Sequence, residues 1–110
     1  MLDKRLQMSN LFDVYGLLLT DKQQLSLTRY LFEDYSLAEI GEEIGASRQA
    51  AYDLVHRAQE TMEQMEEKLG FLERTTKARA LIEELAEDLR NGANADKMKN
   101  TVEQLAALHR

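Results

Sequence analysis

Proline is absent from all 110 residues of this chain, and no other feature of the sequence restricts its possible folds so strongly. Without proline, only glycine is left to interrupt a helix through its backbone preferences, and the chain contains five glycines. Leu, Glu, Ala, Lys, Gln and Met, which favour helices, are abundant, and no segment shows the apolar–polar alternation of a strand. The sequence therefore predicts an all-helical protein.

The size and composition of the chain exclude several classes of protein. A length of 110 residues, 44% of them apolar, fits one modest globular core and leaves no room for a second enzyme-sized domain. Cysteine is absent, which excludes disulfides, thiolate zinc sites and cysteine nucleophiles, and fits a reducing compartment. The first residues form no apolar block long enough for a signal peptide or a membrane span, so we expect a cytoplasmic protein without a membrane partner.

Apolar spacing and capping signals predict two helices in the first third of the chain. The first helix is expected from about Asp3 to Leu19. Thr20 and Gln23 have the spacing of a capping box, which predicts that a second helix starts at Asp21. The first apolar stripe comprises Met8, Leu11, Phe12, Tyr15, Leu18 and Leu19, and the second comprises Leu25, Thr28, Leu31, Phe32 and Tyr35.

The same signals predict a short and then a long helix. Ser36 and Glu39 repeat the capping-box spacing, and the short helix that they open should stop at Gly45, which suits a left-handed turn. Ser47 is the expected cap of a fourth helix that Gly70 ends, roughly 35 Å long at about 1.5 Å per residue. Its apolar stripe comprises Ala51, Leu54, Ala58, Met62, Met65 and Leu69.

The last third of the chain predicts a helical hairpin. One apolar stripe covers residues 81–89 and another covers residues 98–108, with a turn at residues 91–94 between them. We therefore expect a helix-turn-helix domain over residues 1–72. Residues 73–110 should form a C-terminal helical extension that packs on the same domain or on a dimer partner.

Residues 37–57 fit a helix-turn-helix that binds nucleic acid. Such a motif needs two helices that cross steeply through a short turn, often with glycine, and small residues where the backbones approach. Gly41 allows that close approach and Gly45 makes the turn. The expected anchors of the two helices are Ile40, Ile44, Ala51 and Leu54. The alternative is a plain helical corner without a binding role.

The second helix of this motif carries residue types that contact nucleic acids. Arg48 and Gln49 can form paired hydrogen bonds with guanine and adenine edges, and Ser47 can donate to a phosphate from the helix N-terminus. Asp53, in contrast, would stand close to phosphates and oppose binding. The predicted nucleic-acid-binding residues are Ser47, Arg48, Gln49, Tyr52, His56 and Arg57.

The charge distribution argues against a simple DNA-binding protein. The chain has a net charge of −6, and residues 36–72 hold most of it, with three Lys/Arg against eight Asp/Glu. Proteins that bind DNA mainly through contacts with its phosphates usually show the reverse, a basic patch over the motif.

No residue pattern points to catalysis or to a metal. His56 and His109 are far apart in the sequence, so each is best explained as a surface histidine. Glu60, Glu63, Glu66 and Glu67 fit a solvated helix face. No nucleophile, base and orienting group occur in a recognisable arrangement, and no phosphate-binding loop is present. We expect no enzyme activity, no cofactor and no metal.

Three blocks of the sequence, in this order, resemble the YlxM family of bacteria: LLTDKQ at residues 18–23, DYSLAEI at residues 34–40 and SRQAAYD at residues 47–53. The resemblance covers about residues 5–75. More distantly, residues 36–58 are similar to the promoter-reading fourth region of bacterial sigma factors. The sigma pattern departs at Ala50, Tyr52 and Asp53, so this second resemblance implies the fold and not promoter recognition.

The YlxM resemblance implies a helix-turn-helix regulatory protein that takes part in the signal recognition particle pathway of co-translational targeting. The family's link to that pathway comes from gene neighbourhood with the particle's protein and its receptor. Its partner would be the particle's RNA or its protein. Two alternatives stay open: a transcription regulator that binds duplex DNA, and a protein-interaction scaffold that has lost DNA binding. A homodimer is compatible with all three.

Overall fold

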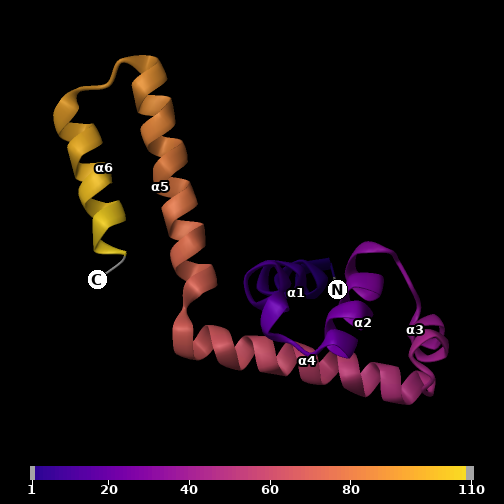
Figure 1. Cartoon of the computed structure of the whole chain (residues 1–110). Helices are drawn as coiled ribbons and strands as arrows, with labels where there is room; N and C mark the ends of the chain where they lie inside the picture. The colour runs from indigo at the N-terminus through magenta and orange to yellow at the C-terminus, as the bar shows by residue number, and fades with distance from the viewer. Residues whose placement is uncertain (1, 109–110) are drawn as a thin grey trace. The chain divides into compact units, whose positions relative to one another are not determined.

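The computed structural model describes residues 2–108, and within this range the chain forms six α-helices and no strand (Figure 1). The expectation of an all-helical fold is thereby confirmed. The elements in chain order are α1 (Leu2–Tyr15), the 3-10 turn η1 (Gly16–Leu18), α2 (Asp21–Phe32), α3 (Leu37–Ile44), α4 (Arg48–Leu69), α5 (Phe71–Asn91) and α6 (Ala95–Ala107).

The chain divides into two compact units, Met1–Gly70 and Phe71–Arg110. The first unit holds α1 to α4, and the second holds α5 and α6. Of the helices that the structure describes, none is both long enough and apolar enough to cross a lipid bilayer.

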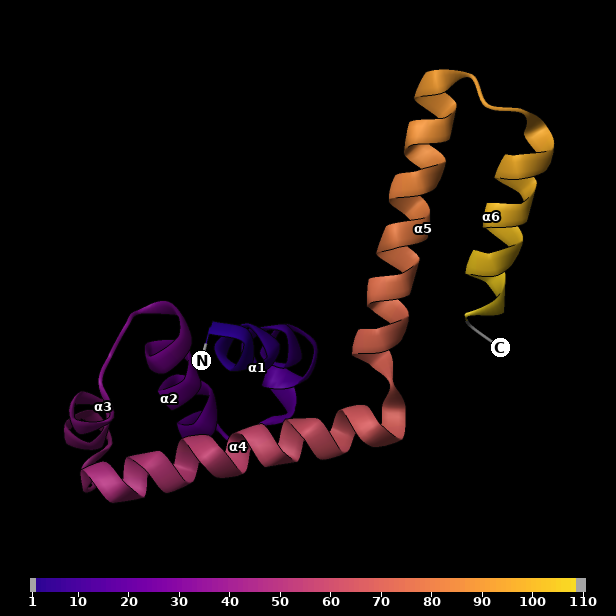
Figure 2. The same cartoon turned by 180° about the vertical axis from the view of Figure 1, so that it is seen from behind.

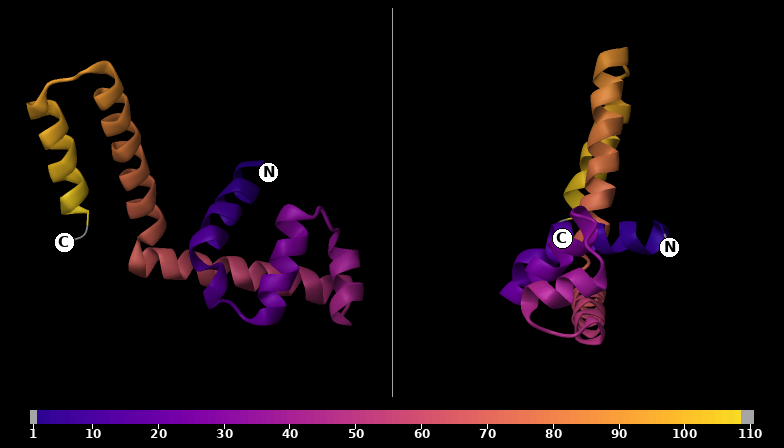
Figure 3. Two further views of the ribbon diagram at one scale, coloured as in Figure 1. Left: turned by 45° about the horizontal axis from the view of Figure 1, so that its top comes forward. Right: turned by 90° about the vertical axis from the view of Figure 1, so that its right-hand side faces the viewer.

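In the first unit, α4 supports the other three helices. α3, α2 and α1 each pack against it, and the ribbon diagrams show these three helices beside α4 (Figures 1, 2 and 3). The buried Tyr15 hydroxyl of α1 donates a hydrogen bond of 2.6 Å to the Glu66 carboxylate of α4. The apolar side chains buried in this core are Met8, Leu11, Tyr15, Leu19, Leu27, Ile40, Ala51, Val55, Ala58 and Met62.

The predicted helix starts are confirmed by their caps. Thr20 and Ser36 each accept a hydrogen bond from the backbone N–H three residues on, and the Gln and Glu at those positions accept one in return. The Ser47 hydroxyl accepts from the backbone N–H of Ala50 at 3.0 Å. Gly45 adopts a left-handed conformation with φ of 72°, as the turn after α3 requires.

The first helix ends at Tyr15, so the prediction that it extends to Leu19 is wrong. Residues 16–18 form a tighter 3-10 turn, and the chain leaves it extended at Leu19. This turn leaves Leu18 64% exposed while Leu19 is buried, although both belong to the predicted stripe. Gly16 packs against the Phe12 ring, where an added Cβ would lie 3.0 Å from a ring carbon, so the ring would have to shift to admit a side chain there.

The buried face of α2 also differs from the predicted stripe. Ser26 and Leu27 are fully buried, whereas Phe32 is 53% exposed and its ring lies 6.0 Å from that of Phe12. α2 therefore turns its Leu27 side toward the core, because contacts with α4 decide its orientation.

The second unit is the predicted helical hairpin. α5 and α6 run antiparallel side by side (Figures 1 and 2). Gly92 has a left-handed φ of 68° in the turn, and the Asn94 side chain caps α6 by accepting from the Lys97 backbone N–H at 2.8 Å. Among residues 71–108, the buried side chains are Asp88 and Thr101.

Candidate nucleic-acid interface

The turn between α3 and α4 is a tight helix-turn-helix. The backbone N–H of Ala46 donates to the Gly41 carbonyl at 2.7 Å. A Cβ on Gly41 would lie 2.7 Å from the Ala46 carbonyl oxygen and 2.9 Å from that of Ser47. The expected role of Gly41 is thereby confirmed, because only a residue without a side chain permits this approach of backbone to backbone.

The two helices of the motif are anchored from both sides of the turn. Ile40 of α3 is 1% exposed and Ala51 of α4 is fully buried, as predicted. Ile44 and Leu54 are only half-buried, and Val55 is an additional buried anchor that is not among the predicted ones. These contacts fix which side of α4 faces away from the core.

All six predicted contact residues lie at the N-cap and in the N-terminal half of α4, and all are exposed. At 3.6 residues per turn, Gln49 and His56 lie along the middle of the exposed face, together with Asp53. Arg48 and Tyr52 lie on one edge of this face, and Arg57 lies on the other. We call the face formed by Ser47, Arg48, Gln49, Tyr52, His56 and Arg57 the recognition strip.

Contacts within α4 order several side chains of the recognition strip. The Gln49 amide donates one N–H to Asp53 at 3.1 Å, which leaves its second N–H and its oxygen for a base edge. The Tyr52 and His56 rings are stacked, with centroids 5.9 Å apart and planes within 5° of parallel. The His56 Nε2 atom lies 3.0 Å from a Glu60 carboxylate oxygen. The strip therefore presents an ordered aromatic pair beside hydrogen-bonding groups.

A shallow groove of about 380 Å³ joins the recognition strip to the start of α2. Lys22 lines this groove together with Arg57, so α2 supplies a further cation to the Arg57 edge of the strip. Lys22 is not among the predicted site residues, because it lies far from the motif along the chain. The other lining residues are Thr20, Gln23, Ala50, Asp53 and Leu54.

Arg29 of α2 compensates part of the negative charge near the motif. Its guanidinium donates to both carboxylate oxygens of Glu43, at 2.9 to 3.1 Å, and also pairs with Glu33. The hydrogen bonds from Arg29 lower the pKa of Glu43, and the bonds to both carboxylates raise the pKa of Arg29. Glu39 has a lowered pKa because the backbone N–H and the hydroxyl of Ser36 both stabilise its ionised form.

The exposed side chains of the recognition strip are hydrogen-bond donors and acceptors with a few cations, which are the groups that suit polar base edges and phosphates. In the part of the chain that the structure describes, no group of three or more His, Asp or Glu side chains could hold a metal ion. His56 contacts Tyr52 and Glu60 instead, and His109 lies outside the described residues.

Comparison with known proteins gives consistent matches over nearly the whole chain. The family UPF0122, described as "Putative helix-turn-helix protein, YlxM / p13 like", matches residues 2–102. A UPF0122 protein of Halalkalibacterium halodurans is 40% identical over 108 residues, which cover 98% of this chain and 99% of the relative. Relatives from Geobacillus kaustophilus and Listeria welshimeri are 44% and 43% identical, over 87% and 96% of this chain and 89% and 96% of their own lengths.

Proposed function

The chain belongs to the UPF0122 family of YlxM/p13-like helix-turn-helix proteins, and from this membership we propose that it is a nucleic-acid-binding regulatory protein of the signal recognition particle pathway. The observation that carries the binding role is the exposed recognition strip, held on α4 by the tight turn after α3. The pathway is the one that the YlxM resemblance implies.

The recognition strip has groups for direct contact with bases and phosphates. The Arg48 guanidinium can donate two parallel hydrogen bonds to guanine, and the Gln49 amide can pair with adenine. Ser47 stands at the N-terminus of α4, where the helix dipole favours a phosphate. The stacked Tyr52 and His56 rings add an aromatic surface on which an unpaired RNA base can stack.

The small number of cations favours a ribonucleoprotein over bare duplex DNA. Arg48, Arg57 and Lys22 are the cations at the strip and its groove, and three phosphate contacts give a salt dependence of only about −2.7 in log–log slope. Such contacts support weak non-specific binding. A basic protein component in the complex would increase the affinity, because it would be attracted to the acidic face of α3. The exposed carboxylates of this face include Glu39 and Glu42.

The experiment is a pull-down with the full chain as bait from bacterial lysate, with and without nuclease, followed by identification of the recovered RNA and protein. The proposal expects enrichment of the particle's RNA or protein over genomic DNA, and nuclease sensitivity shows which component is bound. Arg48→Ala should reduce the recovery. Lys99→Ala removes the same charge from an exposed position of α6 and should leave the recovery unchanged.

A transcription regulator that binds duplex DNA is the second candidate, because the tight turn and the exposed start of α4 also suit the major groove. Enrichment of genomic DNA, lost with Arg48→Ala, would support it against the targeting role. Recovery of protein that neither nuclease nor Arg48→Ala affects would support a scaffold without nucleic-acid binding. A homodimer, which is compatible with each of these functions, would carry two recognition strips.

A further inference from the structure

The helical hairpin has an apolar face that its own two helices leave uncovered. Among residues 71–108, no apolar side chain is buried. Ile82 is 54% exposed and Leu89 is 65% exposed, both on α5. Two helices alone cannot enclose a core, so an apolar face of this kind requires a further layer.

We propose that α5 pairs antiparallel with α5 of a second copy of this chain. The pairing surface is the heptad stripe, defined here as Phe71, Thr75, Ala78, Ile82, Leu85 and Leu89. These positions alternate in spacing by four and three residues, which is the repeat by which helices pair along a continuous seam. The proposal rests on the hairpin and is independent of nucleic-acid binding.

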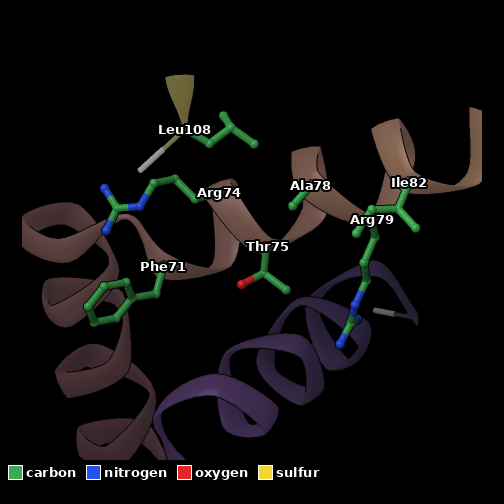
Figure 4. A pocket seen from close by; sticks show the side chains of 7 residues that line it. All are labelled: Phe71, Arg74, Thr75, Ala78, Arg79, Ile82 and Leu108. Atoms are coloured by element: carbon green, nitrogen blue, oxygen red, sulfur yellow. The ribbon is translucent and has the colours of Figure 1, made fainter. Parts of the chain in front are cut away.

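The two halves of the heptad stripe have complementary shapes. The first half, Phe71, Thr75 and Ala78, lines a pocket of about 580 Å³ in which the small side chains of Thr75 and Ala78 leave a hollow between Phe71 and Ile82 (Figure 4). The other residues that line this pocket are Arg74, Arg79 and Leu108. The second half carries the exposed Ile82 and Leu89 and has no small residue in the stripe. An antiparallel copy places the bulky half of each helix over the hollow half of the other.

Antiparallel heptads match each residue of the seam to a partner of suitable size. About a twofold axis near residue 80, Phe71 meets Leu89 of the second copy, Thr75 meets its Leu85 and Ala78 meets its Ile82. Parallel pairing would instead set Thr75 on Thr75 and Ala78 on Ala78, which leaves voids in the seam. The shape of α5 therefore selects the antiparallel arrangement.

The charge of α5 favours the same direction. Residues 73–80 carry Arg74, Lys77 and Arg79 against one acid, whereas residues 81–91 carry four acids against Arg90. Within the hairpin, Lys77 is already paired with Glu73 at 3.0 Å and Asp88 with Lys97 at 2.7 Å, and the other three acids of residues 81–91 face solvent. Antiparallel copies bring the basic half against the acidic half, and parallel copies bring like charges together. A single helix that is complementary to itself in shape and charge points to a second copy as its partner.

Sedimentation of the full chain at micromolar concentration tests the pairing. We expect a dimer for the wild type. Ile82→Lys should raise the dimer dissociation constant by about 100-fold or more, because two ammonium groups would enter the apolar seam against the basic half of the other copy. Leu17→Lys, at a leucine that is 90% exposed in the first unit, is the matched control and should stay dimeric. A monomeric wild type, or an Ile82→Lys dimer of unchanged affinity, would overturn the proposal.

Disulfide trapping tests the direction, because the chain has no cysteine of its own. A mixture of Phe71→Cys and Leu89→Cys chains should form the mixed disulfide dimer under mild oxidation. Neither variant alone should cross-link, since antiparallel pairing holds equivalent residues about 27 Å apart along the helices. Self-linked dimers of each single variant, without the mixed species, would mean that the helices pair in parallel and that the inference is wrong.

Discussion

Gly41→Ala should loosen the helix-turn-helix, although alanine is the better helix former. The new Cβ would meet two backbone oxygens, 2.7 Å and 2.9 Å away, whereas ordinary contacts begin at 3.4 Å. Backbone atoms cannot rotate aside, so the turn must move by about 0.7 Å, the difference between 3.4 Å and 2.7 Å. Overpacking of this kind costs about 1–3 kcal/mol, and loss of the Ala46 to Gly41 hydrogen bond costs about 1 kcal/mol more.

The higher helix propensity of alanine offsets about 1 kcal/mol of this cost, so Gly41→Ala should lower the free energy of unfolding by about 2 kcal/mol. Urea unfolding followed by far-UV circular dichroism measures this difference, and the melting temperature should fall by roughly 10 °C. Glu42→Ala, at the neighbouring exposed position of α3, is the control and should change stability by no more than about 0.5 kcal/mol. A stabilised Gly41→Ala chain would refute the close-approach argument.

Three further predictions concern stability and use the same unfolding assay. Met62→Ala empties a fully buried position and should cost about 2–5 kcal/mol; a loss below 1 kcal/mol would mean that the core is poorly packed. Glu39 and Glu43 have pKa values below the ordinary 4.5, so their contribution is complete above pH 4.5 and is lost as pH falls through the folded pKa values. The double variant Glu39→Gln, Glu43→Gln should lose less stability between pH 5 and pH 3 than the wild type does, and an equal loss would contradict this. Asp88→Leu should leave the stability unchanged or raise it by up to about 1 kcal/mol. The reason is that the buried Asp88 Oδ2 atom has no hydrogen-bond partner in the described chain, whereas the Lys97 side chain is 53% exposed and can be solvated without Asp88. A clear loss of stability would show that the ion pair between Asp88 and Lys97 stabilises the hairpin.

The helix boundaries that follow from local chemistry could be predicted from the sequence. Thr20, Ser36 and Ser47 satisfy backbone groups within the next three residues, so no distant contact is needed to place the starts of α2, α3 and α4. Gly45 and Gly70 end their helices in left-handed conformations for the same local reason.

Features that depend on packing could not be predicted in this way. The early end of α1 at Tyr15 depends on how the chain enters the core at Leu19, and the buried face of α2 depends on its contacts with α4. Lys22 and Arg57 are far apart in the sequence, and only the packing of α2 on α4 places them in the same groove. The Gln49 to Asp53 hydrogen bond, in contrast, has the four-residue spacing of a helical pair and could have been found in the sequence.

The extent of the family resemblance also differs from the prediction. The three sequence blocks predict a resemblance over about residues 5–75, whereas the family matches residues 2–102. The three quoted blocks all lie within residues 18–53, where caps and turns restrict the choice of residue. The hairpin carries heptad spacing and charge instead, which many sequences can satisfy.

Direct titration of labelled signal recognition particle RNA by fluorescence anisotropy, with duplex DNA as the comparison, tests the central claim that the recognition strip binds nucleic acid. We predict saturable binding of the RNA by the wild type and by Lys99→Ala. Arg48→Ala should weaken it by about 10-fold or more, as the loss of one paired contact to a base implies. Equal affinity of the wild type and Arg48→Ala for every nucleic acid tested, or no binding by either, would contradict the account.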